Sequence, residues 1–126
     1  MRRGDLAAAT SVAVASQAQV DAAARRVDEA RAKVDAARSA HTALVAAGTT
    51  SVAVVRSEQF IARVRRDHEV AIEAHARAEA SHRGQTDAVD AARGRLARAR
   101  ADKEVIERHF ARWRTERAKL AERRED

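Results

Sequence analysis

One seven-residue periodicity runs through almost the whole 126-residue chain and is interrupted at a single place. Steps of seven from Leu6 meet small or apolar residues up to His41, and a companion row runs from Ala9 to Leu44. Two such rows are the a and d positions of a heptad repeat, which predicts a helix that packs against another helix. Charged residues fall largely outside both rows. The repeat therefore predicts an amphipathic helix over about residues 5–47.

The composition agrees, because few side chains are large enough to build a compact core. Alanine supplies 33 residues, and the larger apolar side chains number only 24. The chain has no proline, four glycines and 35% charged residues. Such a composition is typical of long helices and coiled coils. It excludes a compact sheet domain, which would need many large buried side chains.

The repeat breaks at Gly48, and threonine and serine follow it at positions 49–51. Glycine suits the left-handed position just past a helix C-terminus, and threonine or serine suits the N-cap of the next helix. The valines that come next are β-branched and form helices weakly, so we expect the second helix to begin at Ser57. The break therefore predicts a turn over about residues 48–56.

A second heptad repeat follows the turn and predicts a helix over about residues 57–124. Its two rows step by seven from Ile61 and from Val64. Their middle part is polar, whereas their last part is large and apolar. The polar positions are His68, His75, His82 and Gln85, and the large apolar ones are Ile106, Phe110, Trp113 and Leu120.

Two helices around one turn predict an all-α fold, namely a single antiparallel two-helix coiled-coil hairpin over residues 1–126 with unequal arms. Folding back at residue 50 places Leu6 opposite the neighbourhood of residue 95. Residues 96–126 would then extend beyond the N-terminus without a partner in the chain. An exposed apolar stripe of this kind usually marks a partner-binding surface.

The formal net charge is +6, with basic and acidic residues interleaved along the chain. Interleaved charges are typical of a solvated helix with pairs such as Glu104–Arg108, whereas nucleic-acid binding normally needs a concentrated basic face. The arginines near Phe110 and Trp113 favour docking on an acidic protein surface, because tryptophan and arginine are enriched in interface hot spots. We therefore expect a protein partner and no nucleic acid.

No pattern points to catalysis, a cofactor or a metal. The chain has no glycine-rich phosphate loop, no Gly-x-Ser-x-Gly and no cysteine, so we expect no enzyme, no catalytic residue and no cofactor. Histidines seven residues apart on a helix are about 10 Å apart, too far to chelate one ion. We expect them to form polar layers in the seam, with a pH-sensitive seam as the alternative. No apolar run reaches about 18 residues, so we expect no membrane insertion, and we interpret the N-terminus as helix rather than signal peptide.

Near the turn, Phe60 stands next to Ile61, and Val64 follows one helical turn later. Ile61 and Val64 belong to the heptad rows, which predicts that they lie in the seam. Phe60 falls outside the rows, because its neighbour already occupies that position. An exposed phenylalanine close to the turn indicates a second contact surface.

These features together resemble one known family. They are an alanine- and arginine-rich heptad arm, a Gly-Thr-Thr-Ser break, a Phe-Ile-x-x-Val segment from Phe60 to Val64, and a Lys-x-x-x-Glu segment from Lys103 to Glu107 that leads into an Arg/Glu-dense tail. The pattern is similar to that of the FliJ/YscO family, the central-stalk proteins of flagellar and virulence type III secretion systems. The virulence branch is slightly favoured.

The resemblance implies a cytoplasmic coiled coil at the base of a membrane-embedded secretion apparatus. The end made by the two termini would insert into the hexameric ring of the secretion ATPase and promote its assembly or activity. The region near the turn would contact the cytoplasmic part of the export gate, and secretion chaperones are further partners to consider. Carried over by position, the gate-binding candidates are Phe60, Ile61 and Val64, and the ring-binding candidates are Phe110, Arg112, Trp113 and Arg117.

Two other functions fit the same heptad pattern. The first is a generic coiled-coil adaptor or structural spacer that dimerises through its C-terminal overhang. The second is an arginine-rich helix that binds nucleic acid. It is less favoured, because seven acidic residues lie in the segment 96–126.

Overall fold

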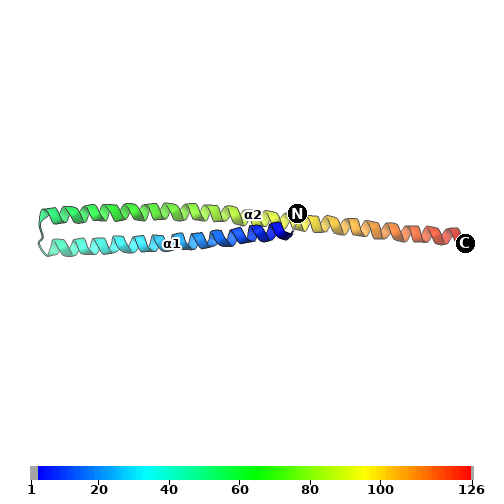
Figure 1. Cartoon of the computed structure of the whole chain (residues 1–126), viewed down its shortest axis with the longest axis horizontal. Coiled ribbons are helices and arrows are strands. Elements are labelled where there is room, and N and C mark those ends of the chain that lie inside the picture. Colours follow the sequence, from blue (N-terminus) through cyan, green and yellow to red (C-terminus); the bar gives the residue numbers. More distant parts are fainter. Residues whose placement is uncertain (1–2, 126) are drawn as a thin grey trace. The chain divides into compact units, whose positions relative to one another are not determined.

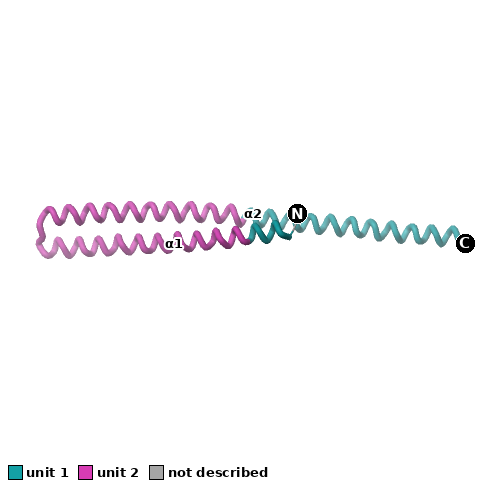
Figure 2. The backbone as a smooth tube through the Cα atoms, viewed as in Figure 1, with its two compact units in different colours: residues 1–10, 87–126 teal, residues 11–86 magenta. Residues whose placement is uncertain are grey.

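The computed structural model describes residues 3–125, and over this range the protein consists of two α-helices without any strand (Figure 1). α1 spans Arg3–Ala46 and α2 spans Ser51–Glu125, with 44 and 75 residues respectively. The predicted all-α hairpin with unequal arms is therefore confirmed. Contacts divide the chain into two compact units, one of residues 11–86 and one of residues 1–10 with 87–126 (Figure 2).

α1 ends where Gly48 adopts the left-handed backbone conformation, with a φ of 72°. A side chain at this position would meet the steric cost that a Cβ brings to positive φ, and glycine avoids it. The amide of Gly48 donates a hydrogen bond of 3.1 Å to the carbonyl of Val45, which satisfies one carbonyl of the last helical turn. The predicted stop at this glycine is confirmed.

α2 begins at Ser51, earlier than the predicted start at Ser57. Thr50 caps the helix, because its side-chain Oγ1 accepts a hydrogen bond of 3.3 Å from the amide of Ala53. A threonine cap stabilises a helix start by about 1 kcal/mol, which offsets the weak helix propensity of the valines in the first turn. The predicted turn is therefore too long, and the connection between the helices is reduced to residues 47–50.

Within residues 11–86 the two helices run antiparallel (Figure 2). Every residue that the sequence assigns to the two rows of α1 is buried or half-buried, and so is every row residue of α2 from Ile61 to Ala99. The best covered part is a cluster of Val34, Ala37 and Val64, against which Ile61 packs. The two rows of each helix therefore form the predicted seam.

Two hydrogen bonds join the arms of this unit. One links Ser16 Oγ and His82 Nδ1 at 2.7 Å, and the other links His41 Nδ1 and Ser57 Oγ at 3.0 Å. The step from Ser16 to His41 along α1 equals the step from His82 back to Ser57 along α2, so both bonds lie in one antiparallel register. A polar pair in a coiled-coil seam specifies register. The two pairs thus set which apolar residues meet between them.

The first of these bonds also determines where His82 carries its proton. The Ser16 hydroxyl donates to the carbonyl of Ala13 at 2.8 Å. Because a hydroxyl has one hydrogen to donate, Ser16 Oγ accepts its second bond from His82. His82 therefore carries a proton on Nδ1.

In the second unit, the start of α1 covers only the first part of the α2 segment. Val89 and Ala92 are 6% and 1% exposed, and Leu6 of α1 is half-buried. Every residue of 101–125, which we call the C-terminal segment, is exposed. The packing of α1 on α2 thus ends near residue 100, close to residue 96, where the sequence predicts that the unpaired part of the second helix begins.

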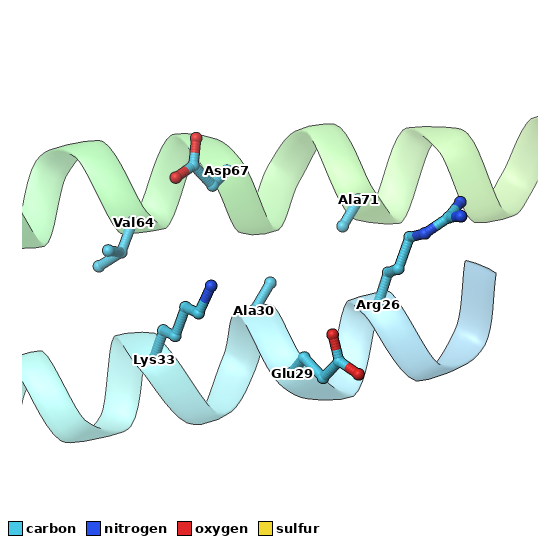
Figure 3. A pocket seen from close by; sticks show the side chains of 7 residues that line it. All are labelled: Arg26, Glu29, Ala30, Lys33, Val64, Asp67 and Ala71. Atoms are coloured by element: carbon cyan, nitrogen blue, oxygen red, sulfur yellow. The ribbon is translucent and has the colours of Figure 1, made fainter. Parts of the chain in front are cut away.

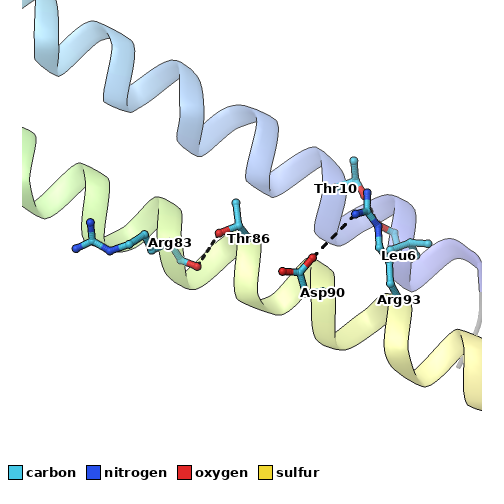
Figure 4. A network of polar contacts seen from close by, with 6 residues as sticks. All are labelled: Leu6, Thr10, Arg83, Thr86, Asp90 and Arg93. Atoms are coloured by element: carbon cyan, nitrogen blue, oxygen red, sulfur yellow. Dashed lines mark hydrogen bonds and ion pairs between the residues drawn. The ribbon is translucent and has the colours of Figure 1, made fainter.

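Figure 4 shows two polar contacts of this unit, each within a single helix. Thr10 donates its hydroxyl hydrogen to the carbonyl of Leu6 at 2.8 Å, and Arg93 lies 4.0 Å from Asp90. An exposed ion pair at this distance contributes little to stability. Both contacts join neighbouring turns of the same helix, and neither of them joins α1 to α2.

Candidate partner-binding surface

The C-terminal segment begins with two ion pairs along one helix. Lys103 Nζ lies 3.9 Å from Glu107 Oε1, and Arg108 lies 3.7 Å from Glu104. Both join exposed residues four positions apart, an arrangement that favours the helix by a few tenths of a kcal/mol. The predicted Glu104–Arg108 pair is confirmed, and the first basic residues of the segment have carboxylates of their own.

The next part of the segment carries two stacked rings and two arginines. The ring centroids of Phe110 and Trp113 are 5.6 Å apart, with an interplanar angle of 25°. The guanidinium of Arg114 lies 4.8 Å from the Phe110 centroid, and that of Arg117 lies 5.1 Å from the Trp113 centroid. Each arginine follows its ring by four residues, which places it over the ring on a helix. We call these four residues the aromatic cluster.

The aromatic cluster is open to solvent and has unpaired cations. Phe110 and Trp113 are 54% and 48% exposed. Among the described residues no carboxylate lies within ion-pair distance of Arg112, Arg114 or Arg117. A guanidinium stacked on a ring keeps its in-plane N–H donors free, and these donors match a carboxylate in bidentate fashion. The cluster can therefore bind a partner that offers both apolar groups and carboxylates.

The structure brings three of the four predicted ring-binding residues together. Phe110, Trp113 and Arg117 belong to the aromatic cluster, whereas Arg112 is exposed and lies outside it. Arg114 is the member that the sequence-based prediction missed. Its spacing from Phe110 equals that of Arg117 from Trp113, and this repeated step of four was the available signal.

A second cationic and aromatic surface lies near the turn. Phe60 is 45% exposed, and the guanidinium of Arg63 lies 5.3 Å from its ring centroid. The two residues line a shallow groove on α2 together with Arg56, Gln59 and Arg66. This groove can accept an acidic partner group beside an apolar one.

Of the three predicted gate-binding residues, Phe60 is exposed, Ile61 is half-buried and Val64 is buried. Val64 is 5% exposed within the buried cluster, and Ile61 packs against that cluster. A partner could reach the Val64 side chain only if the arms separated. Burial therefore assigns Ile61 and Val64 to the seam, and the exposed neighbour of Phe60 is Arg63 instead.

A hollow of about 230 Å³ lies between the two helices in the unit of residues 11–86 (Figure 3). Ala30 and Ala71 point into the space between the helices, and their single methyl groups leave it partly empty. Two cationic and two anionic side chains line it, so it has no net charge that would select a charged ligand. The charged lining residues are Arg26, Glu29, Lys33 and Asp67.

The histidines of the seam occupy separate half-buried layers, as their spacing predicts. They are His41, His68, His75 and His82. Nε2 of His75 lies 3.2 Å from Glu79 of the same helix. In the described part of the chain, no three histidine, cysteine, aspartate or glutamate side chains group so that they could hold a metal ion.

Neither helix, over residues 3–125, has a stretch apolar enough for its length to cross a membrane. The chemistry that the described surfaces offer is stacking, cation–carboxylate pairing and apolar contact. Searches of protein-family models, of curated proteins and of solved structures find no match for this chain.

Proposed function

We propose that this chain is a non-enzymatic central stalk of a type III secretion ATPase complex in the cytoplasm. Its C-terminal segment inserts into the hexameric ATPase ring and promotes the assembly or activity of the ring. Its turn region links the ring to the cytoplasmic part of the export gate. The proposal rests on the resemblance of the sequence to the FliJ/YscO family together with two exposed cationic and aromatic surfaces.

The observation that carries the proposal is the C-terminal segment, in which every described residue is exposed. Large apolar side chains on a helix that has no partner mark a binding surface. Here they stand beside arginines without carboxylate partners, and aromatic residues with arginine are the usual hot spots of protein interfaces. The segment also belongs to a helix that is unbroken from Ser51 to Glu125. The continuous helix keeps the exposed side chains of the segment in one heptad phase.

The groove around Phe60 supports the second part of the proposal. Its phenylalanine is exposed, and three arginines line the same groove on the outside of α2. The groove and the aromatic cluster are formed by different residues of α2, so one partner can occupy each. A linking protein requires two separate binding surfaces of this kind.

A test of the ring assignment uses the type III secretion ATPase of the same organism and the full chain. The double variant Phe110→Ala with Trp113→Ala should weaken binding to the ATPase by at least about tenfold, because each hot-spot aromatic contributes more than 1 kcal/mol. Stimulation of ATP hydrolysis should fall in parallel, while helical circular dichroism remains unchanged. The matched control is Phe60→Ala, which removes an exposed phenylalanine from the other surface.

The control should leave ATPase stimulation intact and weaken binding to the cytoplasmic domain of the export gate. The ring assignment fails if the double variant stimulates the ATPase as well as the original chain does. The gate assignment fails if Phe60→Ala binds the gate domain with unchanged affinity. The two assignments are therefore tested separately by one set of variants.

The second candidate function is a coiled-coil adaptor that dimerises through the C-terminal segment. The exposure of Ile106 and Leu120, at 67% and 54%, favours it, because both continue a heptad row. In this case light scattering should find a dimer of the original chain. The double variant at Phe110 and Trp113 should then be a monomer, and the original chain should leave the ATPase rate unchanged.

A further inference from the structure

We propose that the partner element received by the C-terminal segment is an acidic, amphipathic α-helix. This inference rests on the proposed function in taking the C-terminal segment as the partner-binding part of the chain. It goes further by naming the chemistry of the partner. Three features of the segment lead to it, namely the phase of its heptad rows, the cations within those rows and the excess of basic residues around the aromatic cluster.

The first feature is continuity with an interface that already exists in the same unit. The start of α1 packs there on the α2 row that contains Ala92, which is 1% exposed. The same row continues in steps of seven to Ile106, Trp113 and Leu120, and these three are exposed. A partner covers a heptad row along its whole length only if its own side chains repeat with the same seven-residue spacing, and an α-helix is the element that does so. The occupant of the segment is therefore a helix rather than a loop or a strand.

The second feature is the change in the companion row. Where the row faces α1, from Ile61 to Leu96, it holds apolar residues and histidines. In the C-terminal segment the same row holds Lys103 and Arg117 on either side of Phe110. Burying a cation in a helical seam is costly unless a carboxylate faces it. Lys103 already lies 3.9 Å from Glu107, whereas Arg117 has no carboxylate within ion-pair distance among the described residues. A helix that covers this row must therefore carry glutamate or aspartate opposite Arg117.

The third feature disfavours a second copy of this chain as the occupant. Between residues 108 and 119 the chain has five basic residues and one acidic residue, Glu116. Two copies paired through this stretch would place these like charges together, and that costs association free energy. The stretch instead attracts a partner that carries carboxylates. Among the described residues, Arg112, Arg114 and Arg117 have no carboxylate within ion-pair distance. The five basic residues are Arg108, Arg112, Arg114, Arg117 and Lys119.

The test uses the full chain and three synthetic helical peptides, each as long as the C-terminal segment. The first has leucine and isoleucine in its heptad rows and glutamate at the position that faces Arg117. The second has lysine at that position, and the third has the composition of the first in scrambled order. Trp113 is the only tryptophan of the chain, so its fluorescence reports binding directly. The glutamate peptide should shift the emission to shorter wavelength and bind at least about tenfold more tightly than the others.

A charge reversal in the chain provides the matched comparison. Arg117→Glu should weaken binding of the glutamate peptide by at least about tenfold and strengthen binding of the lysine peptide. Arg108→Glu makes the same change of net charge in the same segment, but Arg108 lies outside the heptad rows and beside Glu104. It should change the affinity by less than about threefold, since a charge at the rim of an interface contributes little to affinity. Circular dichroism checks that both variants keep their helices.

Equal binding of the glutamate and lysine peptides would overturn the inference, and so would equal losses in the two charge-reversal variants. A chain that dimerises through Trp113 in light scattering would overturn it in favour of a second copy. If the ATPase is stimulated but the peptides show no charge selectivity, the acidic helix is refuted and the stalk remains. If the peptides show the selectivity but the ATPase does not respond, the acidic helix is supported and the stalk is refuted.

Discussion

Val64→Ala measures how much the buried cluster of the seam contributes to stability. Val64 is 5% exposed and packs with Val34 and Ala37. The substitution removes two methyl groups, each worth about 0.8 kcal/mol when buried. The removed volume leaves a cavity, because the neighbouring Ala37 has no side chain long enough to fill it, and a cavity adds to the cost. We therefore expect a loss of about 2 kcal/mol before the change in helix propensity is counted.

Val70→Ala is the matched control, since it makes the same change six residues further along α2. Val70 is 60% exposed, so its truncation loses less than half of the burial. Both variants gain the same helix propensity, about 0.5 kcal/mol, when valine becomes alanine. The difference between the two variants therefore isolates burial, and it should be about 1 to 1.5 kcal/mol.

Urea unfolding followed by helical circular dichroism measures both free energies of unfolding. The slope of the free energy with urea concentration should be the same for the two variants, because the surface exposed on unfolding hardly changes. A difference between the variants of less than about 0.3 kcal/mol, which is within the usual error of such comparisons, would refute the assignment of Val64 to a buried seam.

Three further predictions concern single positions. Ser16→Ala leaves Nδ1–H of His82 without its acceptor, so urea unfolding should show a free energy of unfolding that is lower by about 1 kcal/mol. Nitrogen NMR of the original chain should find the His82 proton on Nδ1. A neutral ring protonated on Nε2 would contradict the hydrogen bond. Gly48→Ala should cost about 1 kcal/mol in the same assay, because φ is 72° there although a Cβ would meet nothing within 4 Å. Gly94→Ala should instead raise the thermal midpoint and stabilise by about 1 kcal/mol, since the position is helical and a Cβ there also meets nothing within 4 Å; a lowered midpoint would count against it.

Most residues of the aromatic cluster could be predicted from local sequence patterns. Phe110, Trp113 and Arg117 could be named from the sequence, because exposed large residues on a heptad row beside arginine are a local pattern. The prediction missed Arg114, although its step of four from Phe110 repeats that of Arg117 from Trp113. The contact between Arg114 and the Phe110 ring identifies it. At Ile61 the gate-binding role implied by the resemblance stays a prediction, and the structure adds that this side chain is half-buried and packs against the buried cluster.

Helix content, the stop at Gly48 and the heptad rows all followed from the sequence, because each depends on residues within about one or two helical turns. The antiparallel register depended on the fold, since the hydrogen bond between Ser16 and His82 joins residues that are far apart in the chain. The start of α2 depended on the cap at Thr50, where one side-chain bond outweighs the propensity of several valines. Local periodicity tells which face of a helix is apolar, and contacts between distant residues settle what covers that face and where the cover ends.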